Sequence, residues 1–120
     1  MKRDWDVIRE ILQKAEELEP NKYLELENFS SDTAYEVSYN IRLLYDAGLI
    51  DAEDVSTNGD GPDEFFVFRL TWNGHEFLDS IRSDSVWKKT KDKIVEKGGV
   101  MTFDVVKAVA LGFVKSSLGL

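Results

Sequence analysis

The chain has no cysteine, only two prolines and a single histidine among its 120 residues. Without cysteine it can form neither a disulfide bond nor a thiolate metal site, and a reducing compartment is its natural setting. The first segment, Met1–Glu10, carries charged side chains where a signal peptide would need an apolar run. We therefore expect a cytoplasmic protein.

Positive charge is scarce, because 15 Lys and Arg stand against 23 Asp and Glu and give a formal net charge of −8. The segment Asp51–Glu64 contains carboxylates and no cation, whereas the one basic stretch, Arg82–Lys97, mixes its lysines with acidic residues. A domain with this charge repels a phosphate backbone unless its few cations gather on one face. The composition therefore disfavours nucleic acid as a partner without excluding it.

Groups for acid-base chemistry are also few. His75 is the only histidine, so a Ser-His-Asp triad could be built only around it, and a metal site would have to rely on carboxylates. Its apolar neighbours Trp72, Phe77 and Leu78 indicate instead a packing or capping role at a helix start. We therefore predict no catalytic residue, no cofactor and no bound metal ion, and hence a protein that is not an enzyme.

No apolar run is long enough to cross a membrane. The most apolar stretch, from Phe103 to about Leu118, falls short of the roughly 20 residues that a span needs and is interrupted by Asp104, Lys107 and Lys115. A helix on a membrane surface usually carries many cations, and two lysines are few. We therefore predict no membrane partner.

The same C-terminal stretch predicts self-association. A helix that is apolar over more than half of its circumference must bury a second face, either in its own core or against another protomer. We predict a homodimer through this helix, with full burial within the monomer as the alternative. The candidate dimer residues are Phe103, Val106, Val109, Ala110 and Phe113.

The segment Phe29–Leu78 has the pattern of a helix, a two-stranded hairpin and the start of another helix. Its first part, Thr33–Ile50, has apolar residues at helical spacing: Ala34, Val37, Ile41 and Leu44. Thr33 and Glu36 have the spacing of a capping box at the start of this helix. Gly48 suits the left-handed residue that follows a helix end. This order of elements predicts a winged helix-turn-helix.

The hairpin is predicted from two extended segments. The first strand begins at Leu49, and Phe65–Leu70 has strong β-propensity for the second, with the turn-forming residues Thr57–Pro62 between them. Alternation places three side chains of the second strand on the face predicted to pack on the core. They are Phe66, Phe68 and Leu70.

Four further helices are predicted from capping residues. The caps are Asp4, Thr71, Ser83 or Asp84, and Thr102. Tyr23–Leu26 reads as a short strand or an irregular link rather than the usual small second helix of a helix-turn-helix. The predicted fold class is α+β and mostly helical, a winged helix-turn-helix with a β-hairpin wing and added C-terminal helices. Residues 1–99 form the winged-helix domain with its following helix, and residues 100–120 form the apolar C-terminal helix.

Three segments resemble a known family. They are Lys2–Asp4 with Ile8 and Arg9, Ala47–Ile50, and above all Arg69–Asp79, which reads RLTWNGHEFLD. From Lys2 to about Lys93 the chain is similar to small phage and prophage proteins that are grouped as a winged-helix family of unknown function. The resemblance implies the fold and a bacterial or phage origin, and it implies no chemistry. Asn40 stands where that family is expected to have a histidine.

A shorter pattern is similar to a broader group. The letters AGLI, followed by a hairpin and then by Leu-Thr-x-x-Gly, resemble the multidrug-resistance-type and phenolic-acid-type winged-helix regulators. The phenolic-acid-type regulators dimerise through a C-terminal helix. The resemblance therefore implies the same use for the apolar helix of this chain.

The hairpin turn imitates a calcium-binding loop. The first, third, fifth and sixth positions of such a loop are matched by Asp54, Ser56, Asn58 and Gly59. The twelfth position, which needs a bidentate glutamate, is Phe65, and Glu64 stands one place early. We predict a solvated turn, with weak calcium binding by the Asp54–Glu64 loop as the alternative.

The outward face of the central helix is the candidate binding site. It carries Tyr35, Ser38, Tyr39 and Arg42. A winged helix would turn such side chains into the major groove of DNA. However, Asp46 lies on the same face, and the acidic turn would lie where DNA-binding proteins set cations against phosphates. A face with two tyrosines and an arginine is also typical of the centre of a protein interface, and an ordinary solvated helix face is a third reading.

The sequence therefore predicts a non-enzymatic winged-helix binding module. We expect a phage- or prophage-type protein-interaction or adaptor protein, whose partner is another protein or a second copy of itself. The alternative is a DNA-binding transcriptional regulator that reads the major groove with the helix Thr33–Ala47. Both functions are carried forward.

Overall fold

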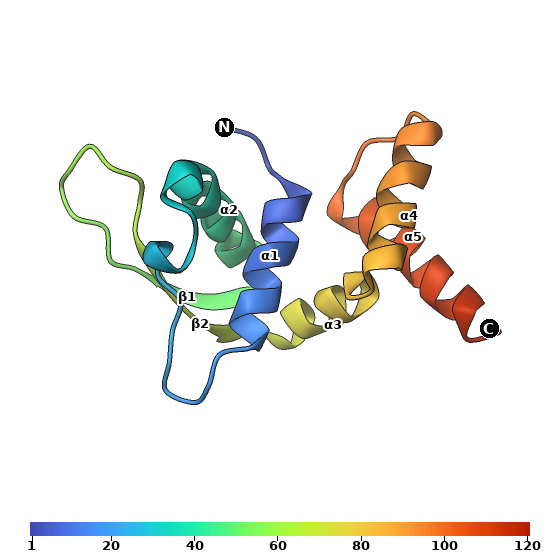
Figure 1. The fold of residues 1–120 in the computed structure, drawn as a ribbon, viewed down its shortest axis with the longest axis horizontal. Coiled ribbons are helices and arrows are strands. Elements are labelled where there is room, and N and C mark those ends of the chain that lie inside the picture. The colour runs from blue at the N-terminus through green and yellow to red at the C-terminus, as the bar shows by residue number, and fades with distance from the viewer. The chain divides into compact units, whose positions relative to one another are not determined.

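The structure is a computed structural model that describes residues 1–120. It divides into two compact units, Met1–His75 and Glu76–Leu120. Its elements in chain order, labelled in Figure 1, are α1 (Trp5–Glu16), α2 (Ala34–Asp46), β1 (Ile50–Asp54), β2 (Phe65–Leu70), α3 (Trp72–Ile81), α4 (Asp84–Glu96) and α5 (Phe103–Ser117). Five helices and one antiparallel hairpin confirm the predicted α+β, mostly helical class. The division into residues 1–99 and 100–120 stays a prediction.

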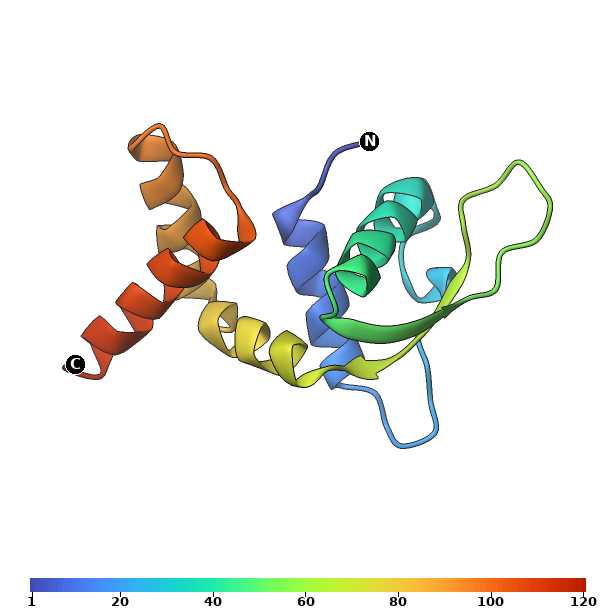
Figure 2. The same ribbon diagram turned by 180° about the vertical axis from the view of Figure 1, so that it is seen from behind.

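Helix α1 begins at its predicted cap. The carboxylate of Asp4 accepts hydrogen bonds from the backbone N–H groups of Asp6 and Val7, at 3.0 and 3.2 Å. These bonds satisfy donors that a helix start leaves without partners. The buried side chains of the helix are Ile8, Ile11, Leu12 and Ala15. Helix α1 packs on α2 and on β2, and Figure 2 shows the two helices side by side.

A buried amide ties the N-terminal residues to α2. Asn40 is 0% exposed, and its Oδ1 accepts a hydrogen bond from the backbone N–H of Asp4 at 2.9 Å. Its Nδ2 donates to the carbonyl oxygen of Glu36, one turn earlier in the helix, at 2.8 Å. The side chain therefore satisfies both of its polar ends inside the protein, as a buried amide must.

The start of α2 differs from the prediction. Thr33 makes no side-chain cap, and its hydroxyl donates to the carbonyl oxygen of Ser30 at 3.1 Å. Ser30 instead caps a short 3-10 turn, Ser31–Thr33, by accepting from the N–H of Asp32. The predicted capping box of Thr33 with Glu36 is therefore wrong, because a serine three residues earlier begins the turn that leads into the helix.

The end of α2 is the predicted left-handed glycine. Gly48 has a φ of 74°, which favours a residue without a side chain. Its N–H donates to the carbonyl oxygen of Tyr45, and the N–H of Leu49 donates to that of Leu44, both at 3.0 Å. This pair of bonds is a Schellman motif, and it turns the chain from the helix into β1.

The hairpin forms as predicted, but its core face is largely the opposite one. Phe65 and Val67 are 1% and 0% exposed, whereas Phe68 is 41% exposed. Phe66 is half-buried, and Leu70 is buried. The prediction that Phe66 and Phe68 belong to the core is therefore wrong, and the prediction for Leu70 is confirmed.

A β-bulge explains the change of face. Asp51 pairs with Arg69 and Ala52 pairs with Val67, so Phe68 has no partner of its own in β1. The extra residue resets the in-out alternation of the strand. Side chains before the bulge and after it can then reach the same core, which a regular strand of this sequence would not allow.

A third extended segment borders β2 at one residue. Leu24 and Val67 form an isolated antiparallel bridge, in which each backbone N–H donates to the other residue's carbonyl oxygen at 2.9 and 3.0 Å. A 3-10 turn, Leu26–Asn28, follows. The predicted link is therefore extended with one bridge at Leu24, and its last residue, Leu26, begins the 3-10 turn.

The start of α3 rests on the turn between α2 and β1. The hydroxyl of Thr71 donates to the carbonyl oxygen of Gly48 at 2.6 Å and accepts from the N–H of Gly74 at 3.1 Å. The N–H of Thr71 donates to the carbonyl oxygen of Leu49 at 3.1 Å. A Cβ at Gly74 would overlap that same oxygen and lie 3.2 Å from the Cβ of Leu70. Thr71 is therefore the predicted cap, and Gly74 permits the close approach.

The second unit contains α3 from Glu76 onward together with α4 and α5, and α4 and α5 pack on each other (Figure 2). Both begin at predicted caps: Ser83 accepts from the N–H of Val86 at 3.3 Å, and Thr102 accepts from that of Val105 at 3.2 Å. Their buried side chains are Trp87, Thr90, Ile94, Val106 and Ala110. None of the helices is long and apolar enough to cross a membrane.

A side chain at Gly74 should separate the two segments that meet there. Gly74→Ala is expected to lower the free energy of unfolding by about 1–3 kcal/mol or more, since backbone atoms must move to admit the methyl group. Gly59→Ala is the matched control, because a Cβ there has no neighbour within 4 Å. Urea denaturation of both variants measures the difference, and equal stabilities would contradict the close approach.

The two faces of β2 can be compared with one chemical change. Phe65→Ala should lower the free energy of unfolding by about 3–5 kcal/mol, because it leaves a cavity in the core. Phe68→Ala should cost only about 1 kcal/mol, the size of an exposed aromatic contact. Thermal and urea denaturation decide between them. A larger loss of unfolding free energy from Phe68→Ala would show that Phe68 faces the core, as regular alternation predicts.

Candidate functional site

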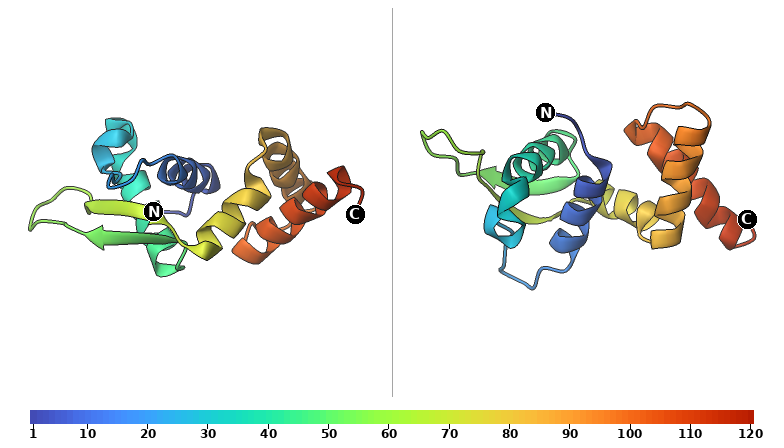
Figure 3. Two further views of the ribbon diagram at one scale, coloured as in Figure 1. Left: turned by 90° about the horizontal axis from the view of Figure 1, so that it is seen from below. Right: turned by 45° about the horizontal axis from the view of Figure 1, so that its top comes forward.

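The four residues predicted to form a binding face line one hollow of the first unit. The hollow has a volume of about 250 Å³, and its other wall is the loop between β1 and β2. Figure 3 shows this loop extending beyond the ends of the strands. The lining residues are Met1, Tyr35, Ser38, Tyr39, Arg42, Gly61, Pro62 and Asp63. Helical spacing therefore grouped the four side chains correctly.

The loop is hydrogen-bonded to the helix face. The hydroxyl of Tyr35 donates to the carbonyl oxygen of Asp60 at 2.9 Å, and the hydroxyl of Ser38 donates to that of Asp63 at 2.5 Å. Ser38 is only 4% exposed as a result. The face that the sequence predicts to point outward is therefore partly covered by the chain's own loop.

The one cation on α2, Arg42, is also in contact with the hairpin. A guanidinium nitrogen of Arg42 lies 2.8 Å from a carboxylate oxygen of Asp54. The guanidinium carbon lies 4.9 Å from the centre of the Phe65 ring, within the range of a cation–π contact. Arg42 is therefore held at the loop end of the two strands.

Asp54 is fixed by more than this ion pair. Hydrogen bonds from Ser56 are the main cause that lowers the pKa of the Asp54 carboxyl below its ordinary value, and Arg42 adds to them. The ionised carboxylate is thus the favoured form in the folded chain. Its contribution to stability is present above the ordinary pKa and is lost as the pH falls through the lowered one.

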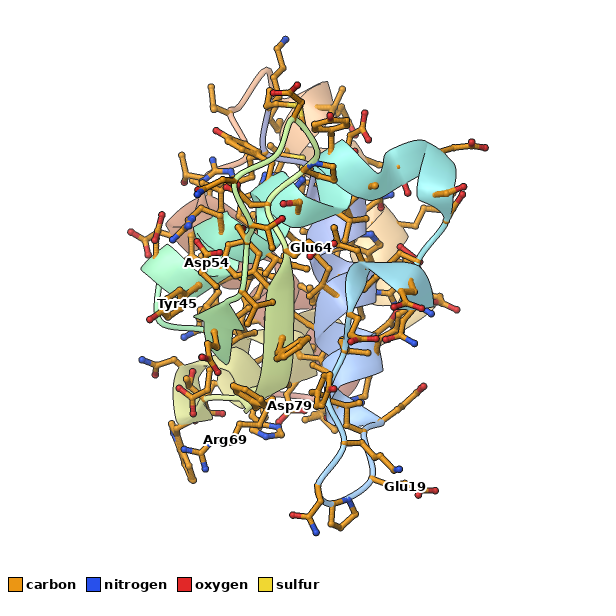
Figure 4. The ribbon with its side chains drawn as sticks, turned by 90° about the vertical axis from the view of Figure 1, so that its left-hand side faces the viewer. Glu19, Tyr45, Asp54, Glu64, Arg69 and Asp79 are labelled. Carbon is orange, nitrogen blue, oxygen red and sulfur yellow. The ribbon has the colours of Figure 1, made fainter.

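Two of the positions that imitate a calcium loop, Asp54 and Ser56, make hydrogen bonds where the hairpin strands end. The N–H of Ser56 donates to a carboxylate oxygen of Asp54 at 2.9 Å, and the hydroxyl of Ser56 accepts from the N–H of Glu64 at 2.9 Å. Figure 4 shows Asp54 and Glu64 where the strands open into the loop. No group of three or more histidine, aspartate or glutamate side chains in the chain is placed to hold a metal ion.

His75 lies in the first turn of α3, and its side chain is 51% exposed. Its Nδ1 is 3.9 Å from a carboxylate oxygen of Glu16, which is longer than a hydrogen bond. Its backbone N–H donates to the carbonyl oxygen of Thr71 at 3.0 Å. The packing or capping role predicted for its side chain and the absence of a catalytic role both stay predictions.

The five candidate dimer residues of α5 lie on two sides of the helix. Val106 and Ala110 are 0% exposed and therefore belong to the chain's own core. The Phe103 ring packs on the ring of Phe77, with centres 4.7 Å apart. Val109 and Phe113 are only half-buried. They line a hollow of about 340 Å³ together with Lys93, Ala108, Gly112 and Ser116.

Local sequence patterns do not indicate a second surface that the structure shows on the first unit. Tyr23, Phe66 and Phe68 form an aromatic cluster on the outer side of β2. Alternation assigned two of these residues to the core, and the signal that could have corrected it is the bulge. The bulge depends on pairing with a distant strand, and no local pattern of residues reports it.

Comparison with known proteins gives a family and no activity. Residues 2–100 match the family described as "Hypothetical protein (DUF2513)". An "Uncharacterized protein" of Haemophilus influenzae is 40% identical over 119 residues, which are 98% of this chain and 99% of that protein. No solved structure was found to match. Neither description mentions a fold, an activity or a phage, and on the extent of both matches the chain belongs to the DUF2513 family of hypothetical proteins.

Proposed function

We propose that the protein is a non-enzymatic winged-helix module that binds another protein. The order of elements in the first unit supports this fold. Helix α1 is followed by the extended residue Leu24, by two 3-10 turns where a second helix usually stands, and by α2. The hairpin β1–β2 then takes the place of the wing. The RLTWNGHEFL resemblance favours the same fold and a phage or prophage origin.

The observation that carries the protein-binding function is that the loop between β1 and β2 is bonded to the outward face of α2 and partly covers it. A helix that reads DNA must enter the major groove with its outward side chains free. Here Tyr35 and Ser38 donate to carbonyl oxygens of the loop, and Arg42 is paired with Asp54. Reading bases would require the loop to leave and all three side chains to change partners.

The charges around this face favour the same function. The loop brings the carboxylates of Asp60, Asp63 and Glu64 into the segment that would lie along the DNA backbone. DNA-binding proteins place lysines and arginines there. When these cations neutralise phosphates, counterions are released from the DNA, and this release supplies much of the binding affinity. Regulation through DNA is therefore the second candidate, and the resemblance to winged-helix regulators is what favours it.

A second copy of the chain is one partner that fits. Ala108, Gly112 and Ser116 lie on successive turns of α5 beside the half-buried Val109 and Phe113. Small side chains in such a row let a second helix approach closely, and the flanking apolar groups would then leave water. Two-fold homodimers are also the commonest oligomers of soluble proteins.

The two candidate functions predict different DNA affinities when the loop between β1 and β2 is released from α2. Tyr35→Phe combined with Ser38→Ala removes both hydrogen bonds to the loop with little change of shape. In a gel shift at physiological salt, the wild type and this variant should both bind random duplex DNA more weakly than about 10⁻⁴ M. Affinity capture from bacterial lysate should yield partners that survive nuclease. Tight DNA binding by the variant, with a steep salt dependence, would favour the regulator instead.

The proposed dimer can be tested by introducing one charged side chain on the exposed face of α5. Ala108 is exposed in the chain, so Ala108→Glu should leave the monomer folded but bury an unpaired carboxylate in a dimer. Ser85→Glu adds the same charge at an exposed position of α4 and serves as the control. Sedimentation at about 50 μM should give dimers for the wild type and the control and monomers for Ala108→Glu. A monomeric wild type would rule the dimer out.

A further inference from the structure

The outer side of the hairpin exposes a cluster of aromatic side chains. The ring centre of Tyr23 lies 4.4 Å from that of Phe66 and 6.3 Å from that of Phe68. Tyr23 and Phe68 are 43% and 41% exposed. Single exposed apolar residues are common on protein surfaces, but large ones gathered in a patch mark interaction sites.

A hollow continues from this cluster along β2. Phe66 belongs to both, and the hollow has a volume of about 270 Å³, with Leu26 and Val55 as apolar walls. Its rim carries three carboxylates and no cation: Glu25, Glu27 and Glu64. Figure 4 looks onto this side of the hairpin and shows Glu64 at the loop end of the strands. We call the aromatic cluster and this rim together the aromatic-acidic groove.

The carboxylates of the rim act on one another. Desolvation first, and then the charge of Glu27, a hydrogen bond shared with Glu27 and the charge of Glu64, raise the pKa of Glu25 above its ordinary value. A raised pKa means that the ionised form is disfavoured where these groups meet. A cation that entered the groove would remove this repulsion and find three acceptors beside it.

We propose that the aromatic-acidic groove binds a segment of a partner protein that carries both arginine and apolar side chains. Arginine satisfies both halves of the groove, because its planar guanidinium stacks on aromatic rings and bonds carboxylates in pairs. The apolar side chains of the segment would enter the hollow between Leu26 and Val55. The inference rests on the proposed protein-binding function and gives the chemistry of the partner.

Charge complementarity selects this occupant over others. A phosphate backbone or an anionic membrane surface would be repelled by the three carboxylates of the rim. A purely apolar segment would cover Glu25, Glu27 and Glu64 without satisfying them, and buried carboxylates without partners are costly. A segment that carries both arginine and leucine side chains meets both requirements at once.

The test measures binding of a fluorescein-labelled synthetic peptide, Gly-Arg-Leu-Arg-Leu-Arg-Gly, to the full chain by fluorescence anisotropy. The rim variant carries Glu25→Gln, Glu27→Gln and Glu64→Gln and should bind roughly tenfold more weakly or worse. The charge-matched control carries Glu10→Gln, Glu17→Gln and Glu96→Gln, three exposed positions outside the groove, and should change affinity by less than about twofold. Circular dichroism verifies that each variant is folded.

Two further arms test the aromatic half and the peptide. Phe68→Ala should weaken binding by roughly fivefold, as expected for loss of a ring that stacks on a guanidinium. Peptides with serine in place of leucine, or glutamate in place of arginine, should bind more weakly than the parent. Equal binding by the rim variant and its control, equal binding of the glutamate peptide, or no binding of the parent peptide up to about 1 mM would overturn the proposal.

A failure here can be separated from a failure of the proposed function. The rim variant and the wild type are both used as bait in the nuclease-treated capture. If the rim variant retains the wild type's protein partners, the groove is not their site, and the protein-binding function still stands. If the wild type captures only nuclease-sensitive material, the protein-binding function itself fails. Loss of a partner by the rim variant alone, together with the peptide result, supports the groove.

Discussion

The contact between the start of α3 and the turn after α2 is the constraint on which the first unit depends. Thr71 donates to the carbonyl oxygens of two successive residues of that turn, Gly48 and Leu49, and the two segments approach so closely that a side chain at Gly74 would not fit between them. Leu70, one residue before Thr71, is thereby held in the ladder with its side chain in the core. Because Val67 is also a core residue, the strand can serve both ends only by carrying one residue more than regular alternation allows. Phe68 is that residue.

One hairpin therefore makes two surfaces of opposite character. Its loop folds onto α2, where the hydroxyls of Tyr35 and Ser38 bond to loop carbonyls. Its bulged strand turns Phe66 and Phe68 outward, toward a rim of carboxylates. The face that helical spacing marks for binding is thus partly covered, and the face that strand alternation marks as core is partly exposed. Both differences have one origin, because each depends on how the hairpin meets the rest of the unit.

The sequence could predict helix ends because their signals act over a few residues. The caps at Asp4, Thr71 and Thr102 and the glycine after α2 all have this property. The prediction for Thr33 was wrong because Ser30, three residues earlier, supplies the capping side chain of the turn that leads into α2. The covering of α2 was out of reach, since Ser38 bonds to a loop carbonyl 25 residues away. The α5 set mixed inward and outward residues, because a helix that is apolar on most sides does not say which half meets its own core.

The buried amide of Asn40 attaches the N-terminal residues to α2, and its chemistry decides how this attachment responds to acid. The side chain at this position must offer one acceptor for the N–H of Asp4 and one donor for the carbonyl of Glu36. A neutral histidine ring offers the same pair, but it would lose its acceptor on protonation, near an ordinary pKa of about 6.5. Aspartate would lack the donor, and leucine would lack both. Asparagine therefore makes the attachment of the chain's beginning to α2 insensitive to pH across the range in which a histidine would release it.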